Sequence, residues 1–318
     1  MRNETRLLAR LADGWNDAPV TLLNPPEATA AHCVAAAEIC SDDYTIQQAC
    51  ARRRQTPSCR FGIPSVAPAA ARVVLFPPRA RRRLAALLSL QRGALQQPVE
   101  LILIGAKRSG IGGAHKLLEE IADAVKRIDA ARHCQAFSAT LTPGPRAELD
   151  DWLTWHPIAH GDTDLAIASL PGVFASGRLD SGTALLLQTL IEAGPPAPGS
   201  ERALDFGCGA GILAAALSKQ GWQVDAVDND YWALQAAQAT LQANALPVAT
   251  QPVTGAGGLN RRYSLIVSNP PFHEGVDQTT STAQDLITRL PELLQPGGQA
   301  LIVANRFLPD EAAARRAG

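Results

Sequence analysis

A short glycine-rich segment, Asp205-Phe-Gly207-Cys208-Gly209-Ala-Gly211, has the composition of a ligand-binding loop. Glycine lets the backbone turn tightly and approach a ligand closely, and a helix that follows offers free N–H donors. The spacing is G-x-G-x-G, whereas the dinucleotide fingerprint G-x-G-x-x-G leaves room for a pyrophosphate. An acidic residue before the glycines would repel a pyrophosphate, but it can accept hydrogen bonds, through the loop, from a cationic amino-acid group. The segment therefore predicts a ligand with such a group.

A second acidic position, Asp228, lies 17 residues beyond Gly211, at the end of the apolar segment 224–227. A carboxylate at the end of a strand can accept both ribose hydroxyls of a nucleoside, as in dinucleotide-binding folds. Taken alone, Asp205 or Asp228 is more often a helix cap or a surface charge. In this order and at strand ends, the loop and the carboxylate predict a nucleoside site, to which Asn229 is also assigned.

The motif Asn269-Pro270-Pro271-Phe272 directly follows the apolar segment 265–268. Prolines remove N–H donors and leave carbonyl groups facing outward. The Asn269 carboxamide and the Pro270 carbonyl could accept both protons of an –NH2 group, while the Phe272 ring stacks on the planar molecule that carries it. A plain turn with a core Phe is the alternative for the motif alone. With the glycine loop upstream in the same sheet, chemistry on a planar amine is favoured.

Alternating strand and helix patterns would position these residues. A turn-rich linker at 192–201 precedes the alternation, and repeated β-α-β units predict a doubly wound parallel sheet with right-handed crossovers. The expected strands are 203–206, 224–227, 265–268 and 300–304, and the expected helices are 212–219, 231–245 and one that carries Leu286, Ile287, Leu290 and Leu293.

The N-terminal half repeats part of this order. Residues 73–78 read as a strand followed by two prolines, a helical stretch runs through Leu87, and 101–105 read as a strand. This half contains no D-x-G-x-G-x-G and no Asn before its two prolines. The sequence therefore predicts two tandem α/β domains, a degenerate one at 1–150 and a ligand-binding one at 151–318.

The net charge of -1 hides an asymmetry between the two halves. Residues 1–150 hold 20 Lys and Arg against 14 Asp and Glu, whereas residues 151–318 hold 9 against 16. Arginine clusters at 52–54 and at 79–83 suit phosphate contacts, because guanidinium groups pair bidentately with phosphate oxygens. A solvated face in an arginine-rich chain (25 of its 29 basic residues are Arg) is the alternative.

Other classes of protein are disfavoured. There is no apolar stretch of the ~20 residues that a membrane span needs and no signal-peptide pattern, so a cytoplasmic protein is expected. The six cysteines form no C-x-x-C pair and show no metal-ligand spacing with the histidines, so no metal site is expected.

Together, the glycine loop, Asp228 and the Asn-Pro-Pro-Phe motif resemble class I methyltransferases that modify amino nitrogens. Further segments are similar to the RsmC family, the bacterial small-subunit ribosomal RNA guanine-N2 methyltransferases, which have two tandem domains of which only the second binds cofactor. Those segments are 103–110, 170–174, 179–183, 269–275 and 303–309.

The resemblance implies S-adenosyl-L-methionine as cofactor and methyl transfer to a guanine N2 amine in small-subunit (16S) ribosomal RNA. It implies ribosomal RNA or the small ribosomal subunit as partner, no membrane, and a monomer. The catalytic positions are Asn269, Pro270, Pro271 and Phe272. The implied cofactor-binding positions are Asp180, Gly182, Thr183, Asp205, Gly207, Cys208, Gly209, Gly211, Asp228, Asn229 and Thr254.

Two departures from the family pattern bear on these expectations. Thr254 stands near the adenine, after the third strand, where relatives usually carry Asn or Asp. The chain stops at Gly318, soon after the fifth strand, so the second sheet is expected to lack its last strands and to leave 300–304 as an apolar edge.

Three alternatives to small-subunit guanine methylation remain at the level of sequence. The same chemistry could act on large-subunit ribosomal RNA or on another amine in RNA, DNA or protein. An NAD-dependent oxidoreductase is disfavoured by the glycine spacing and by the Asn-Pro-Pro-Phe motif. A truncated, non-catalytic RNA-binding relative is the third alternative.

Overall fold

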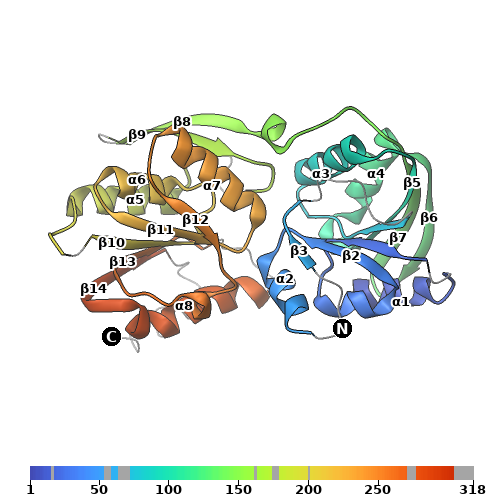
Figure 1. The fold of residues 1–318 in the computed structure, drawn as a ribbon, viewed down its shortest axis with the longest axis horizontal. Coiled ribbons are helices and arrows are strands. Elements are labelled where there is room, and N and C mark those ends of the chain that lie inside the picture. Colours follow the sequence, from blue (N-terminus) through green and yellow to red (C-terminus); the bar gives the residue numbers. More distant parts are fainter. Residues whose placement is uncertain are drawn as a thin grey trace. The chain divides into compact units, whose positions relative to one another are not determined.

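The computed structural model divides the chain into two compact units, residues 1–152 and residues 153–318. Each unit is an α/β structure built around its own sheet and is described by itself (Figure 1). None of the helices in the described part of the chain is long and apolar enough to cross a membrane. The structure describes residues 1–15, 18–53, 59–63, 72–160, 163–173, 179–199, 201–270 and 277–303.

The N-terminal unit contains a sheet in the order β3-β2-β1-β4-β5-β7-β6. Strands β1 to β5 run parallel to one another, and β7 runs antiparallel to both of its neighbours, β5 and β6. In chain order the elements are α1 (Asn3–Ala12), β1 (Val20–Leu23), η1 (Ala28–Cys33), β2 (Ala36–Ser41), α2 (Tyr44–Ala51), β3 (Cys59–Phe61), β4 (Arg72–Leu75), α3 (Arg81–Ala94), β5 (Val99–Ala106), η2 (Lys107–Ser109), α4 (Ile111–Ile121), β6 (Asp123–Ala131), β7 (Cys134–Leu141) and η3 (Leu149–Trp152).

Helices cover both faces of this sheet because its central strands are apolar on both sides. All four residues of β1 are buried, and alternate residues of β5 point to opposite faces. One core cluster joins α1 and η1 to the sheet, with Leu8 and Ile104 among its members. The other cluster joins α3 and α4 to the opposite face, through Leu88 and Leu118.

The C-terminal unit contains a parallel sheet in the order β12-β11-β10-β13-β14, together with a two-stranded hairpin. In chain order its elements are β8 (Thr154–His160), β9 (Thr163–Ser169), α5 (Ser181–Ala193), β10 (Arg202–Phe206), α6 (Ile212–Lys219), β11 (Gln223–Asp228), α7 (Tyr231–Ala243), β12 (Ala249–Pro252), η4 (Ala256–Gly258), β13 (Tyr263–Ser268), α8 (Asp277–Leu293) and β14 (Leu294–Ile302).

Parallel register brings the ends of the central strands to one edge of the sheet. Leu204 of β10 lies beside Ile266 of β13, and Phe206 lies beside Val227 of β11. Leu286 of α8 packs on one face in a cluster with Phe206. Helices α5, α6 and α7 lie on the other face (Figure 1). The segments that follow β10, β11, β12 and β13 therefore leave the sheet at its common carboxyl edge.

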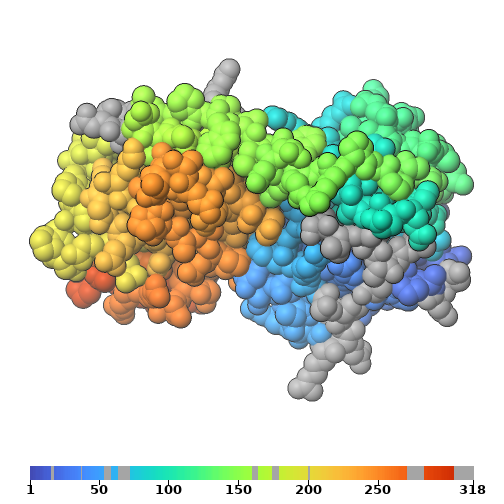
Figure 2. All heavy atoms as spheres, turned by 45° about the horizontal axis from the view of Figure 1, so that its top comes forward, coloured from blue at the N-terminus to red at the C-terminus, as the bar shows by residue number. Residues whose placement is uncertain are grey.

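The β8–β9 hairpin is attached to the C-terminal unit by side chains of α7. Asn244, just beyond α7, bonds both the amide and the carbonyl of Ala166, at 3.1 and 2.8 Å. The Thr240 hydroxyl accepts a hydrogen bond from the amide of Ala168. The hairpin, yellow-green in Figure 2, lies on the surface of this unit beside the orange atoms of α7.

The predicted fold class, two tandem α/β methyltransferase-like domains, is confirmed, and one strand differs from expectation. The strand expected at 300–304 begins at Leu294, and Pro296-Gly297-Gly298 forms an irregularity within β14 instead of a turn before it. A Cβ on Gly298 would lie 2.9 Å from the Tyr263 carbonyl, so this close strand approach requires glycine. Among the described residues β14 is the edge strand, and 304–318 lie outside them.

Candidate active site

The glycine loop turns sharply where β10 meets α6. The amides of Gly207 and Cys208 both donate to the carbonyl of Val227, at 2.8 and 3.0 Å. Gly207 and Gly209 have φ values of 76° and 53°, a region that favours glycine. A Cβ on either residue would meet no atom of the described residues within 4 Å, so they leave open space beside the loop. The loop is thus a cradle with room for a ligand against its backbone.

Asp228 lies at the end of β11 and holds the loop. One carboxylate oxygen accepts from the amide of Gly209 at 3.0 Å, and the other accepts from the amide of Asp230 at 3.0 Å. The carboxylate is therefore directed toward the glycine cradle. Asn229, the next residue, is exposed beside it.

Asp205 occupies a different place from the one that its position in the motif suggests. Its carboxylate is buried, with 1% of the residue exposed, and it accepts from the amide of Ala214 in α6 at 2.9 Å. Burial raises the pKa of Asp205 to about 7, against the Ala214 hydrogen bond and with help from the Asp228 charge. Asp205 therefore braces the loop from beneath. Its contact with a ligand stays a prediction.

Cys208 is also buried, and burial raises the pKa of its thiol well above the ordinary value. The side chain thus stays a neutral thiol, packed under the loop. Its main-chain amide holds the loop to β11.

Asn269 follows β13, the strand beside β10, and lies at the same edge of the sheet as the cradle. Its amide nitrogen donates to Asp180 Oδ1 at 3.0 Å and to Thr183 Oγ1 at 2.8 Å. Only 8% of the residue is exposed, and its Oδ1 atom has no hydrogen-bond partner among the described residues. A buried acceptor without a donor is costly, so a ligand that brings an N–H would satisfy it.

The start of α5 surrounds this carboxamide. Asp180 caps the helix by accepting from the amides of Gly182 and Thr183, at 3.0 and 3.1 Å. Burial by itself would raise the pKa of Asp180, but hydrogen bonds from the Thr183 and Asn269 side chains and from these amides lower it below the ordinary value. A Cβ on Gly182 would lie 2.9 Å from Asn269 Oδ1, so the helix approaches Asn269 closely only because glycine is present.

The remaining predicted positions are placed less fully. Thr254 is partly buried just after β12, whose neighbour is β11, and the amide of Val253 donates to the Asp228 carbonyl. Pro270 is partly buried next to Asn269. Pro271 and Phe272 lie outside the described residues, so their roles stay predictions.

One residue at the carboxyl edge of the sheet could not be singled out from the sequence. Asp285 of α8 accepts from the amide of Ala256 at 2.8 Å and thereby fixes the segment after β12. A Cβ on Gly255 would lie 2.9 Å from the same carboxylate. Asp285 has the spacing of an ordinary charged residue on a helix, so only the fold brings it to this loop.

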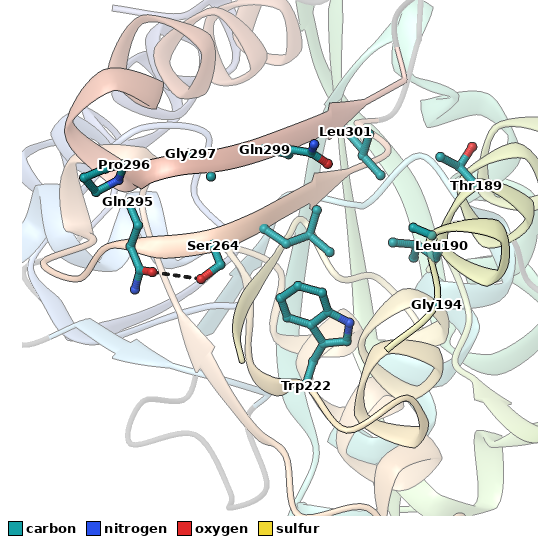
Figure 3. Close-up of a pocket in the computed structure, with 13 residues that line it drawn as sticks. Thr189, Leu190, Gly194, Trp222, Ser264, Gln295, Pro296, Gly297, Gln299 and Leu301 are labelled. Carbon is teal, nitrogen blue, oxygen red and sulfur yellow. Dashed lines mark hydrogen bonds between the residues drawn. The ribbon is translucent and has the colours of Figure 1, made fainter. Parts of the chain in front are cut away.

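A separate pocket lies between α5 and the strands β13 and β14 (Figure 3). Its lining includes Leu190, Trp222 and Leu301, and Ser264 donates to Gln295 at its rim at 2.8 Å. None of the predicted site residues lines it. Within the described part of the chain, no group of three or more His, Cys, Asp or Glu side chains is placed to hold a metal ion.

Comparisons with known proteins define the class. Residues 164–317 match the family model of the methyltransferase small domain, and residues 5–156 match its N-terminal domain. The solved structure of the T. thermophilus 16S rRNA N2 methyltransferase RsmC, in complex with AdoMet and guanosine, covers 99% of this chain and is itself covered to 86%. It has a TM-score of 0.83 at 24% identity. The chain is an S-adenosylmethionine-dependent methyltransferase with two tandem domains.

Curated relatives define the family more closely. The ribosomal RNA small subunit methyltransferase C of Alcanivorax borkumensis is 36% identical over 97% of this chain and 91% of the relative. The protein of the same name from Hahella chejuensis is 38% identical over 74% of this chain and 69% of the relative. The chain belongs to the ribosomal RNA small subunit methyltransferase C family.

Proposed function

We propose that this enzyme methylates the exocyclic N2 amine of a guanine in small-subunit ribosomal RNA. The observation that carries the proposal is the buried Asn269 Oδ1, which has no hydrogen-bond partner within the described part of the chain and lies at the same sheet edge as the glycine cradle. The names of the relatives support ribosomal RNA as substrate, and the guanosine in the T. thermophilus complex is consistent with guanine as target.

The residues at the sheet edge fit S-adenosylmethionine. The backbone of Gly207, Gly209 and Gly211 would hold its amino-acid portion, and Asp228 would accept the ribose hydroxyls. Asn229 and Thr254, which lie next to Asp228 in the chain and just after the neighbouring strand β12, would contact the base. When bound, the cofactor supplies an electrophilic methyl group on a sulfonium centre.

Asn269 would hold the target amine by accepting one of its protons at Oδ1, and the Pro270 carbonyl would accept the other. A conjugated amine is a weak nucleophile, so orientation matters more than proton abstraction. Fixed alignment of reactants can supply on the order of 7–11 kcal/mol of a barrier. The two acceptors would also stabilise positive charge as it develops on nitrogen. Pro271 and Phe272 are proposed to support and stack on the base.

The two halves of the chain are proposed to have different roles. Residues 151–318 would bind cofactor and carry out transfer, whereas the basic half, residues 1–150, would serve as a scaffold that contacts RNA phosphates. A monomer in the cytoplasm stays the expectation.

Methyl transfer to isolated ribosomal subunits tests this proposal. Tritiated S-adenosylmethionine is incubated with small subunits, large subunits and naked ribosomal RNA, and the labelled nucleosides are then identified. Label in N2-methylguanosine of the small-subunit RNA, absent with Asn269→Ala, is the expected result. Label in N6-methyladenosine, in large-subunit RNA or in protein would refute the substrate. Binding of RNA with no transfer by the wild type would support the non-catalytic alternative.

A further inference from the structure

We infer that Asp180, Gly182 and Thr183, at the start of α5, are positioning residues that fix the orientation of the Asn269 carboxamide and so select an amine as the target. This inference rests on the proposed function, because it assigns the device by which that site recognises its substrate. Sequence resemblance connects these three residues only with the cofactor.

The first step of the argument is the pairing of the Asn269 nitrogen. A side-chain amide can turn over by rotation and exchange its oxygen and nitrogen, so its orientation follows from its partners. The nitrogen of Asn269 faces Asp180 Oδ1 at 3.0 Å and Thr183 Oγ1 at 2.8 Å. A carboxylate only accepts hydrogen bonds, so Asp180 forces the –NH2 end of the amide to face it.

The second step concerns the Thr183 hydroxyl, which could otherwise act as a donor. Its proton is committed to Asp180 Oδ2, at 2.5 Å, so its lone pairs are left for Asn269. The two –NH2 protons of Asn269 thus meet two acceptors. In the reversed orientation, the amide oxygen would face the Asp180 carboxylate and the hydrogen bond to it would be lost.

The third step is steric. Gly182 lies so close to the carboxamide that an added Cβ would be 2.9 Å from Oδ1 and 3.2 Å from Nδ2. The same Cβ would lie 3.0 Å from Val303 Cγ1, so it could not move aside freely. The absence of a side chain at position 182 therefore allows the start of α5 to lie close to the Asn269 carboxamide and to bond it.

The consequence is a fixed acceptor at the site. Because the –NH2 end is held by α5, the buried Oδ1 atom is the end that has no partner among the described residues. An acceptor that cannot rotate into a donor favours a substrate N–H and disfavours a carbonyl oxygen or an apolar C–H at the same place. Sites built in this way discriminate strongly, because the wrong substrate leaves a buried polar group unpaired.

Thr183→Val tests the inference, because valine has nearly the shape of threonine and removes only the hydroxyl. The affinities of guanosine and of inosine, which lacks the N2 amine, are measured by equilibrium dialysis in the presence of S-adenosylhomocysteine. We expect the preference for guanosine to fall by about tenfold, as for one lost orienting hydrogen bond. Thr183→Ser should restore the preference, and Gly182→Ala should lower it.

A matched control lies two turns further along the same helix. Thr189 is also a threonine of α5, and its hydroxyl donates to the Leu185 carbonyl at 2.9 Å within the helix. Thr189→Val should leave the guanosine-to-inosine ratio unchanged. A structural role of Thr183 would weaken both nucleosides equally, so an unchanged ratio in Thr183→Val would overturn the inference.

The side-chain amide of Asn269 gives a readout that does not need a substrate. In the wild type both Nδ2 protons are bonded, so their ¹H–¹⁵N signals, assigned by their loss in Asn269→Ala, should exchange slowly with water. One proton should become fast in Thr183→Val, and fast exchange of both in the wild type would contradict the inference. If the wild type does not methylate guanine, the proposed function fails. In that case the role of Thr183 is still decided by the Asn269 amide signals, together with the affinities of adenosine and of purine riboside, which lacks the amine.

Discussion

The two units share the strand order of their parallel cores, and they differ at the residues that could do chemistry. The register of the strands shows which positions of the two units are equivalent. Leu23 ends β1 and Phe206 ends β10, and in each unit the amide of the next residue donates to the neighbouring strand. The Asn24 amide donates to Cys40 at 2.8 Å, as the Gly207 amide donates to Val227. Position 24 in the first unit thus corresponds to position 207 in the second.

The same register aligns the other two chemical positions. Ser41 corresponds to Asp228, and each accepts a hydrogen bond from the amide two residues later, at 3.1 and 3.0 Å. Phe76, one residue after the partner of Leu23 on β4, corresponds to Asn269 and is buried in the core. Gly207, Asp228 and Asn269 of the second unit are thus matched by Asn24, Ser41 and Phe76 in the first.

Several polar side chains at the edge of the first sheet pair with one another. Asn24 and Asp42 exchange two hydrogen bonds of 3.1 Å, and Arg83 of α3 pairs with Asp42 at 2.9 Å, with both charged side chains largely buried. In the second sheet, Asn269 Oδ1 has no partner, and Gly207 and Gly209 have no close neighbours, among the residues that the structure describes. A unit can thus keep the fold while polar side chains at the carboxyl edge of its sheet pair with one another instead of being left for a ligand.

The largest effect is expected when the second unit receives the residue of the first at the amine position. Asn269→Phe removes the acceptor and should lower methyl transfer by about 10²–10³-fold, as for other fixed groups that stabilise developing charge. Single-turnover transfer measures the loss, and binding of S-adenosylhomocysteine serves as the control for folding. Transfer within a few-fold of the wild type would remove Asn269 from the mechanism.

Breaking the internal pairing of the first unit should cost stability instead of activity. Arg83→Met leaves the Asp42 charge buried without its cation and should destabilise the N-terminal unit by about 3 kcal/mol. The matched control is Arg81→Met, because Arg81 pairs with Glu120 in an exposed ion pair that is worth under about 1 kcal/mol. Urea unfolding resolves the two variants, and equal costs would contradict the distinction.

Two helix-capping glycines compare the units at matched backbone geometry. Gly110 and Gly211 have φ values of 84° and 78°, so alanine strains both positions alike. A Cβ would meet nothing at Gly110 but would lie 3.0 Å from Ala237 at Gly211. Gly211→Ala should therefore cost about 1–3 kcal/mol more than Gly110→Ala. Peptide-resolved hydrogen exchange measures each unit, and the reverse ranking would show that the close contact relaxes freely.

The last difference is a dependence of stability on pH that Asp205 should contribute in the second unit. Burial raises the pKa of Asp205 from 3.8 to about 7, so across this range the folded protein holds a proton that the unfolded chain releases. The free energy of unfolding should therefore fall as pH rises from about 4 to about 7, by at most about 1.4 kcal/mol per pH unit. Urea unfolding of Asp205→Asn, which keeps an acceptor for Ala214, should lack this slope. A slope retained in the variant would assign it to another group.

The sequence predicted the fold where periodicity and glycine spacing are strong. The strands around Asp205, Asp228 and Asn269 were expected within one or two residues, because buried parallel strands read as continuous apolar runs. The irregularity within β14 was missed, since Pro296-Gly297-Gly298 reads as a turn when the neighbouring strand is unknown.

The site was predictable as a set of residues but not as a set of hydrogen bonds. The resemblance assigns Asp180 and Thr183 to the cofactor, which stays a prediction, but it did not foresee that they bond Asn269, which lies 89 and 86 positions away in the chain. The ligand contact of Asp205 stays a prediction, but its hydrogen bond from the Ala214 amide was not foreseen, because spacing does not tell on which side of a strand a carboxylate is buried. The side of the sheet on which a side chain is buried, and the group to which it bonds, depend on how the strands and helices pack.

Calorimetric titration with S-adenosylhomocysteine tests most directly whether only the second unit keeps a cofactor site. The full chain should bind one molecule, and Asp228→Ser, which installs the residue of the first unit, should weaken binding by about tenfold or more. The reciprocal Ser41→Asp should leave the stoichiometry at one. Two sites in the wild type, or full affinity in Asp228→Ser, would contradict this account.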